Sequence, residues 1–124
     1  MSFYYLSNPY QGTEAQRKER AHLAAETTLF LLKQGIPVFS PIVHNHSLVQ
    51  EMPELSTEER RLLFLPFDFV MLKVAKRMIV LKLEGWEHSH GVKAEINFCE
   101  EHHIPVVYAN LEELKTPEIL NSLG

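Results

Sequence analysis

The chain has 124 residues, a formal net charge of −4 at pH 7, 45% hydrophobic residues and 23% charged residues. This length and balance are typical of one globular domain with a substantial core, and the negative charge argues against a protein that binds a nucleic-acid backbone. Cys99 is the only cysteine, so no disulfide can form within the chain, which fits a reducing cytosol. We see no signal peptide and no apolar run that would span a membrane, and we expect a cytoplasmic protein whose partner is a small molecule.

The hydrophobic pattern predicts strands that alternate with helices. Thr13 and Gln16 form a capping box that opens the first long helix, and Gly35 ends it. Pro66 falls inside the second long helix and predicts a kink there. The expected strands are residues 3–6, 36–39, 78–83 and 104–108, and the expected helices are about residues 14–34, 57–76, 90–103 and 111–123.

Residues 40–56 show no clear period and contain prolines and two histidines, so we expect a long loop over the strand ends. Short strands that alternate with helices, without hairpin signals, predict an α/β fold. The expected architecture is a three-layer α/β/α sandwich with a Rossmann- or flavodoxin-like parallel sheet of four to five strands. We expect residues 1–124 to form a single domain.

The segment 85–95 follows the apolar run 78–81, so a buried strand is expected to lead into a helix here. Ser89 is a suitable N-cap for that helix, and Glu95 falls on its apolar face together with Val92. A lone carboxylate on such a face is costly to bury unless it is paired, hydrogen-bonded or facing a cavity. Either the helix is tilted so that Glu95 reaches water, or Glu95 lies in a cleft at the carboxyl end of the strand, where open α/β sheets bind ligands.

Asp68 is a second lone carboxylate, because residues 62–72 are otherwise apolar. Burial raises carboxyl pKa values, and two carboxyls in different settings can divide the roles of acid and base. The dipole of the helix that carries Glu95 helps to keep that carboxylate ionised, so Asp68 is the expected proton carrier. Tyr5, at the end of the first strand, either orients a carboxylate through its hydroxyl or is a half-buried core aromatic.

Several further residues are candidates for ligand binding. Ser89 and Gly91 precede and open a helix, where a capping hydroxyl and free backbone N–H groups bind an anion or merely shape the turn. Arg17 and Arg20 follow the first loop and either reach a phosphate or stay solvated. Trp86 either stacks on a ring of the ligand or packs on the surface.

The histidines offer an alternative, a metal-binding or scaffolding protein. His-x-His occurs twice, and the pairs are His44 with His46, His88 with His90, and His102 next to His103. Zinc needs three or four ligands with supporting partners, and the lone Cys99 is expected in the core. We therefore predict no metal and no cofactor, which elemental analysis of the purified protein would test.

Four segments resemble, in the same order, those of the nucleoside 2-deoxyribosyltransferase-like superfamily. They are Tyr5-Leu6-Ser7-Asn8-Pro9, the segment 67–72 around Asp68, the segment 78–81, and Ser89-x-Gly91-x-x-x-Glu95. The resemblance extends from Tyr5 to about Tyr108. It is greatest for a small bacterial and phage branch that shares the pattern Gly-Trp-x-x-Ser-x-Gly-x-x-x-Glu.

The resemblance implies chemistry on the N-glycosidic bond of nucleosides or nucleotides. Glu95 matches the nucleophile that attacks C1′ of the sugar and forms a glycosyl-enzyme ester, which water or a second base then resolves. Tyr5 would hold Glu95, and Asp68 would contact or protonate the departing base. Serine at position 89, where transferases of free nucleosides have an acidic residue, favours nucleoside 5′-monophosphates, since a carboxylate would repel a phosphate.

The first loop differs from that of the nucleotide hydrolases in this superfamily. Their Gly- and Arg-rich loop, which binds phosphate, is replaced here by residues 8–12. We assign Ser7 and Asn8 to substrate binding, with Ser89, Gly91, Arg17 and Trp86. The resemblance implies a homodimer or larger homo-oligomer, and the runner-up function is a protein that senses a nucleotide or nucleotide-sugar without turning it over.

Overall fold

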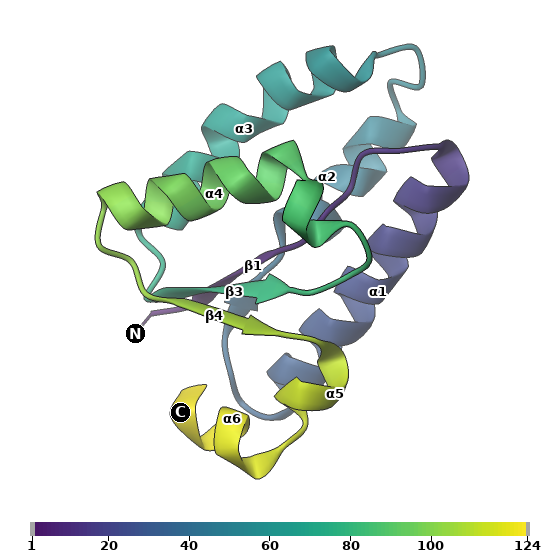
Figure 1. Cartoon of the computed structure of the whole chain (residues 1–124). Coiled ribbons are helices and arrows are strands. Elements are labelled where there is room, and N and C mark those ends of the chain that lie inside the picture. Colours follow the sequence, from purple (N-terminus) through teal and green to yellow (C-terminus); the bar gives the residue numbers. More distant parts are fainter. Residues whose placement is uncertain (1, 124) are drawn as a thin grey trace.

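A computed structural model describes residues 2–123 and forms one sheet of four parallel strands (Figure 1). The strand order is β2-β1-β3-β4, so β1 and β3 are the central strands. The strands are β1 (Tyr4–Ser7), β2 (Val38–Phe39), β3 (Arg77–Leu81) and β4 (Val106–Ala109). The predicted α/β fold with a parallel sheet is confirmed, at the lower of the two expected strand numbers.

Helices cover both faces of the sheet and complete the three layers (Figure 1). On one face α3 and α4 pack over the strands, and on the other face α1, α5 and α6 do so. The helices are α1 (Glu14–Lys33), α2 (Pro41–Gln50), α3 (Thr57–Lys73), α4 (His90–Glu101), α5 (Leu111–Leu114) and α6 (Pro117–Leu123), with a 3₁₀ turn, η1 (Trp86–His88). None of the helices within residues 2–123 is both long and apolar enough to cross a membrane.

The alternation of side chains along β1 divides the core into two halves. Tyr4 and Leu6 are buried in the half beneath α1 and α6, whereas Tyr5 is buried in the half beneath α3 and α4. Cys99 lies in this second half, in the core as expected. Neighbouring residues of β1 therefore serve opposite layers of the molecule.

The helix ends follow the capping signals in the sequence. The predicted box is present, with Thr13 Oγ1 accepting from the backbone of Gln16 at 3.1 Å and Gln16 Oε1 accepting from the backbone of Thr13 at 2.9 Å. Gly35 follows α1 with a φ of 77°, a left-handed conformation that glycine adopts without strain. At α4, Ser89 Oγ accepts from the backbone of Val92 at 3.3 Å.

The prediction of a loop over residues 40–56 is wrong in its first part, because Pro41–Gln50 form α2. Ser40 caps this helix by accepting from the backbone of Val43 at 3.1 Å, and Pro41 is at the first helical position, which tolerates proline. Asn45 and Val49 are four residues apart and both buried. The polar Asn45 on the buried face conceals the apolar period that would have predicted a helix.

The expected final helix over 111–123 is two helices, because Lys115 and Thr116 separate α5 from α6 and Pro117 opens α6. A proline lacks the N–H that would continue α5, so the chain turns before α6 begins. The turn lets Leu123 return to the core beneath β1, where its backbone oxygen accepts a hydrogen bond from the hydroxyl of Tyr4.

The order of connections reverses between β1 and β3. β1 leads through α1 to β2 on one side of the sheet, whereas β3 pairs with β1 on the other side and leads through α4 to β4. The loops after β1 and β3 therefore diverge at the same edge and leave a crevice. Open parallel sheets bind their ligands at such a switch point.

Candidate active site

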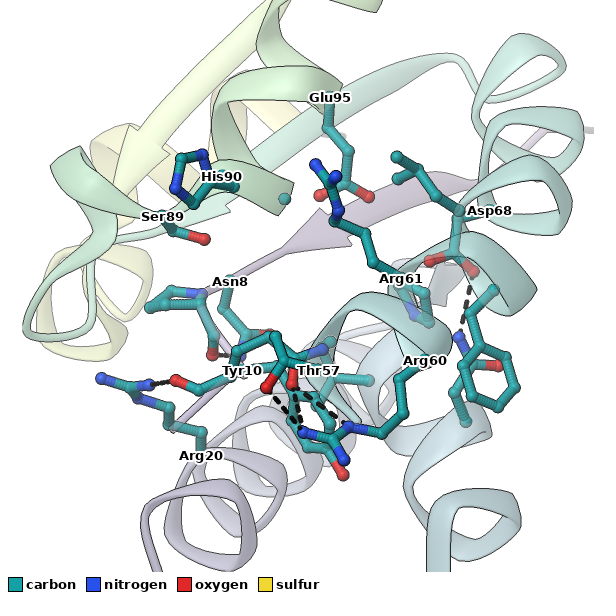
Figure 2. Close-up of a pocket in the computed structure, with 18 of the residues that line it drawn as sticks. Asn8, Tyr10, Arg20, Thr57, Arg60, Arg61, Asp68, Ser89, His90 and Glu95 are labelled. Carbon is teal, nitrogen blue, oxygen red and sulfur yellow. Dashed lines mark hydrogen bonds between the residues drawn. The ribbon is translucent and has the colours of Figure 1, made fainter. Parts of the chain in front are cut away.

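A cavity of about 420 Å³ opens at the carboxyl ends of β1 and β3. Its walls come from the loop after β1, from α2 and α3, and from the start of α4 (Figure 2). Five of the predicted site residues line it, namely Asn8, Asp68, Ser89, Gly91 and Glu95. The structure thus brings residues from three distant parts of the chain to one concave site.

Glu95 projects from α4 toward this cavity and is only 6% exposed (Figure 2). Both of its oxygens are held by β1: the Tyr5 hydroxyl donates to Oε2, and the Ser7 hydroxyl donates to Oε1 at 2.8 Å. Tyr5 and Ser7 are two positions apart and therefore face the same side of the strand. Of the two interpretations of Glu95, a carboxylate in a cleft is correct, and a tilted helix that exposes it is wrong.

Burial raises the pKa of Glu95 to about 7, and the negative charge of Asp68 adds to this increase. The hydrogen bonds from Tyr5 and Ser7 act in the opposite direction, because they stabilise the carboxylate. Burial, followed by the neighbouring charge of Glu95, raises the pKa of Tyr5 as well, so Tyr5 remains a protonated donor at neutral pH. The carboxylate of Glu95 can therefore gain and lose a proton near neutrality.

Asp68 lines the cavity from α3 and is 8% exposed. Asn45 of α2 donates from Nδ2 to Asp68 Oδ1 at 3.0 Å, and His44 Nδ1 lies 2.7 Å from the side-chain oxygen of Asn45. Burial raises the pKa of Asp68 to about 6, against the opposing effects of Asn45 and His44. Asp68 therefore has a different environment from Glu95, but the order of the two pKa values is the reverse of the expected one, because burial raises the pKa of Glu95 further than that of Asp68.

The start of α4 faces the cavity through Ser89 (Figure 2), and Gly91 also lines it. A Cβ added at Gly91 would meet only Ser89 Oγ, at 4.0 Å, so packing within the protein does not demand glycine here. Asn8 is 4% exposed and donates from Nδ2 to the oxygen of Pro9 at 2.9 Å, while its buried Oδ1 has no hydrogen-bond partner within residues 2–123. A buried acceptor without a partner is ready to receive a donor from a ligand.

Three predicted binding residues do not line the cavity, and one of them, Ser7, is fully buried and donates to Glu95. Arg17 donates to the backbone oxygen of Gly12 at 2.7 Å, and Trp86 packs against Tyr108 with ring centroids 5.6 Å apart. Of the alternatives for Trp86, packing within the protein is the one observed. Arg20, the other arginine of α1 that we considered, does line the cavity.

Asn45, Arg60 and Arg61 also line the cavity, although the sequence did not indicate them as site residues. Asn45 was missed because its segment was assigned to a loop. For Arg60 a signal existed, because Arg60, Phe64 and Asp68 are spaced by four residues and so share one face of α3. A charged residue in the first turns of a helix is usually solvated, and this signal was therefore weak.

The histidine pairs do not come together. Within residues 2–123 no group of three or more His, Cys, Asp or Glu side chains could hold a metal ion. His44 stacks on Phe67 and His46 Nδ1 lies 2.6 Å from the Tyr10 hydroxyl, so these two side chains take part in packing and hydrogen bonding around the cavity.

Fold and cavity define an α/β protein with two buried carboxyl groups at the switch point of a parallel sheet. A family model described as a domain of unknown function (DUF1937) matches residues 2–111, and the chain belongs to this family. Curated proteins provide no match to the chain.

Proposed function

We propose that this protein cleaves, or transfers between bases, the N-glycosidic bond of a nucleoside or nucleoside 5′-monophosphate, with Glu95 as nucleophile. The supporting observation is the carboxylate of Glu95, buried at the cavity with each oxygen held by a donor on β1. A buried carboxylate with a perturbed pKa in a cleft is typical of functional sites rather than of a structural core. The resemblance to the nucleoside 2-deoxyribosyltransferase-like superfamily supports the same assignment.

In the first step one oxygen of Glu95 attacks C1′ of the sugar, and the bond between C1′ and the base nitrogen breaks with its electron pair leaving on the base. The protonated form of Asp68 gives its proton to the base, because a protonated base is a far better leaving group. Tyr5 and Ser7 keep the nucleophile pointed at the cavity throughout.

In the second step water, or the nitrogen of another base, attacks C1′ and releases Glu95 as a carboxylate. Asp68, now ionised, accepts the proton that the attacking group loses. Two displacements at C1′ retain the configuration of the sugar. Water as acceptor makes the protein a hydrolase, and a base as acceptor makes it a transferase.

The rest of the cavity supports a nucleotide as ligand. The unpartnered Oδ1 of Asn8 can accept from a sugar hydroxyl. Ser89 and the free N–H groups at the start of α4 can bind a 5′-phosphate, because the positive end of the helix dipole favours an anion. Apolar side chains of α2 and α3, among them Ile42 and Phe64, can pack against the base.

Base release, measured by chromatography, tests the proposal. Nucleosides and 5′-monophosphates are incubated with the protein, with and without an acceptor base. We expect a free base from the wild type and none from Glu95→Ala, whereas Glu100→Ala, which removes an exposed carboxylate from the same helix, retains the activity. If no base is released but a nucleotide raises the melting temperature, the protein is a nucleotide sensor and the enzymatic proposal is wrong.

We further infer that the partner of this protein is a second copy of itself, bound through the outer face of α3. Leu63, Phe67, Val70 and Val74 are spaced by four, three and four residues, and their exposed fractions are 52%, 39%, 65% and 66%. This spacing places them in one stripe, as in helices that pair. Glu59 precedes the stripe and Lys73 lies at its far end, so two antiparallel copies of α3 bring opposite charges together.

A cytoplasmic location is part of the proposal. Nucleotides are metabolites of this compartment, and Cys99 is a free, buried thiol.

A further inference from the structure

Arg60 is a buried cation at the wall of the cavity, with only 5% of the residue exposed. Its guanidinium donates to Gln11 Oε1 at 2.9 and 3.2 Å, to the oxygen of Leu55 at 2.5 Å and to Thr57 Oγ1 at 3.2 Å. Every one of these acceptors is neutral. Hydrogen bonds to neutral groups satisfy the geometry of a guanidinium but leave its charge uncompensated.

No carboxylate compensates that charge within residues 2–123. The ion pairs in this part of the chain join Arg61 with Glu58, Lys82 with Glu113, and Lys115 with Glu112. Arginine is rarely buried without an acidic partner or ligand. Burial is the main cause that lowers the pKa of Arg60, and the nearby charge of Arg17 adds to it against the opposing effect of Tyr10.

Two more guanidinium groups line the same cavity (Figure 2). Arg20 donates to the backbone oxygen of Gln11, and Arg60 holds the side chain of that glutamine, so α1 and α3 fasten the loop after β1 from both sides. Arg61 is paired with Glu58 at 3.0 Å in an exposed pair within one helix, which contributes little and can be displaced by a stronger anion. Figure 2 shows Arg20 and Arg60 at the end of the cavity away from Glu95.

We propose that the arginines that line this cavity, Arg20 and Arg60 at the end away from Glu95 and Arg61 along its wall, bind the outer phosphates of a nucleoside 5′-diphosphate or 5′-triphosphate. The nucleoside part of this assignment rests on the proposed function. The start of α4 offers a place for the phosphate next to the sugar. Of its five N–H groups Arg60 uses four within the protein, so it offers the ligand one free donor and its charge. Arg20 donates only to the backbone oxygens of Gln11 and Glu84 and keeps its other N–H groups for the ligand. Planar guanidinium groups bind phosphate oxygens in pairs, which suits a chain of phosphates better than a neutral group.

This arrangement also accounts for the sequence of the first loop. Residues 8–12 contain no arginine, yet the loop lies between guanidinium groups contributed by α1 and α3. The positive charges that would bind phosphate are thus contributed by helices α1 and α3 and not by the loop. A ligand that extends from α4 along the loop toward α3 would contact each of these groups.

Binding can be measured apart from turnover in a Glu95→Gln background. Calorimetry with the 5′-mono-, di- and triphosphates of the common nucleosides, without divalent cations, gives affinities even when no reaction occurs. For the nucleosides that bind, we expect the triphosphate to bind at least about tenfold more tightly than the monophosphate. Replacing Arg60 by glutamine, or Arg61 by glutamine, is expected to lower this ratio by roughly tenfold.

Arg77→Gln is the matched control, because Arg77 lies at the start of β3, away from the cavity, and donates to the oxygen of Ser122. It removes the same charge and should leave the ratio intact. Melting temperatures establish that each variant is folded, and the less buried Arg61 provides the test if Arg60→Gln is unstable. As a probe without a base, inorganic tripolyphosphate should stabilise the wild type more than inorganic phosphate at equal ionic strength.

Monophosphates that bind as tightly as triphosphates would overturn the inference, and so would a ratio that falls equally in Arg77→Gln. The outcome is separate from that of the proposed function. If base is released from monophosphates but triphosphates bind no more tightly, the proposed enzymatic function is supported and the arginine subsite is refuted. If triphosphates bind more tightly through the arginines but no nucleotide releases its base, the arginine subsite is supported and the proposed enzymatic function is refuted.

Discussion

The hydroxyl of Tyr5 on β1 donates to the carboxylate of Glu95 on α4, across 90 positions of the chain and inside the protein. The bond exists because β1 directs every second side chain toward α4, so Tyr5 and Ser7 reach Glu95 while Tyr4 and Leu6 point away. A slip of one residue in the pairing of β1 would exchange these two sets. The hydrogen bonds that hold Glu95 therefore depend on the register of β1.

The two adjacent tyrosines provide a matched pair of variants. Tyr5→Phe keeps the ring and removes a donor to the Glu95 carboxylate, so we expect the pKa of Glu95 to rise and base release to slow by roughly tenfold. Tyr4→Phe removes a donor to the oxygen of Leu123 on the opposite face, at a cost of about 1 kcal/mol in the free energy of unfolding. The pH dependence of kcat/KM distinguishes them: only Tyr5→Phe should change it, and equal changes would contradict the role of Tyr5.

The raised pKa of Glu95 also makes stability depend on pH. Its value in the folded protein, about 7, exceeds its ordinary value of 4.5, so the folded state binds the proton more tightly than the unfolded state does. The contribution of Glu95 to stability is therefore fully present below pH 4.5 and is lost as the pH rises from there through 7. Glu95→Gln cannot ionise, and the wild type should lose on the order of 3 kcal/mol relative to it between the two limits.

Urea denaturation at several pH values measures this difference. Glu100→Gln, on the exposed face of α4, serves as the control and should follow the wild type. Parallel stability curves for the wild type and Glu95→Gln would show that Glu95 ionises freely in the folded protein. This measurement requires no substrate and is independent of the proposed function.

Asp68 should determine how activity depends on pH. The two carboxyls, with pKa values of about 6 and about 7, predict a bell-shaped kcat/KM with its maximum between these values, which belong to the pair rather than to either residue. Asp68→Asn removes the proton donor, and we expect base release to fall by roughly 10²- to 10⁴-fold and the alkaline limb to disappear. A substrate whose leaving group needs no proton should be affected far less, and an equal loss for both substrates would argue against Asp68 as the acid.

The apolar stripe on α3 predicts the oligomeric state. Val70→Asp places a charge in the centre of the stripe and should convert a dimer into a monomer in sedimentation measurements. Leu29→Asp is the control, because Leu29 is 53% exposed on α1 and lies outside the stripe. A wild type that sediments as a monomer at all concentrations would exclude the α3 interface.

The four strands and the three long helices α1, α3 and α4 could be predicted from the sequence, because their apolar patterns are clear. Glu95 and Asp68 could be singled out because each carboxylate interrupts such a pattern. Asn45 could not, because a polar residue on a buried face removes the very period that identifies a helix. Burial of Arg60 depends on the loop that carries Gln11, which lies 49 positions away, and no local pattern reports such a contact. The apolar excess of α3 was visible, but the sequence does not distinguish an apolar side chain in the core from one on an open face such as Val70.

The position of β1 in the sheet also has a consequence for the order of folding. β1 is the earliest strand in the chain, yet its partner β3 follows only at residues 77–81 and the acceptor for Tyr4 at Leu123. Contacts between such distant segments form slowly, because the chain must close long loops before they contribute. The contacts of Tyr5 therefore form late in folding. We expect α1, whose contacts are local, to become ordered well before β1, the strand that precedes it.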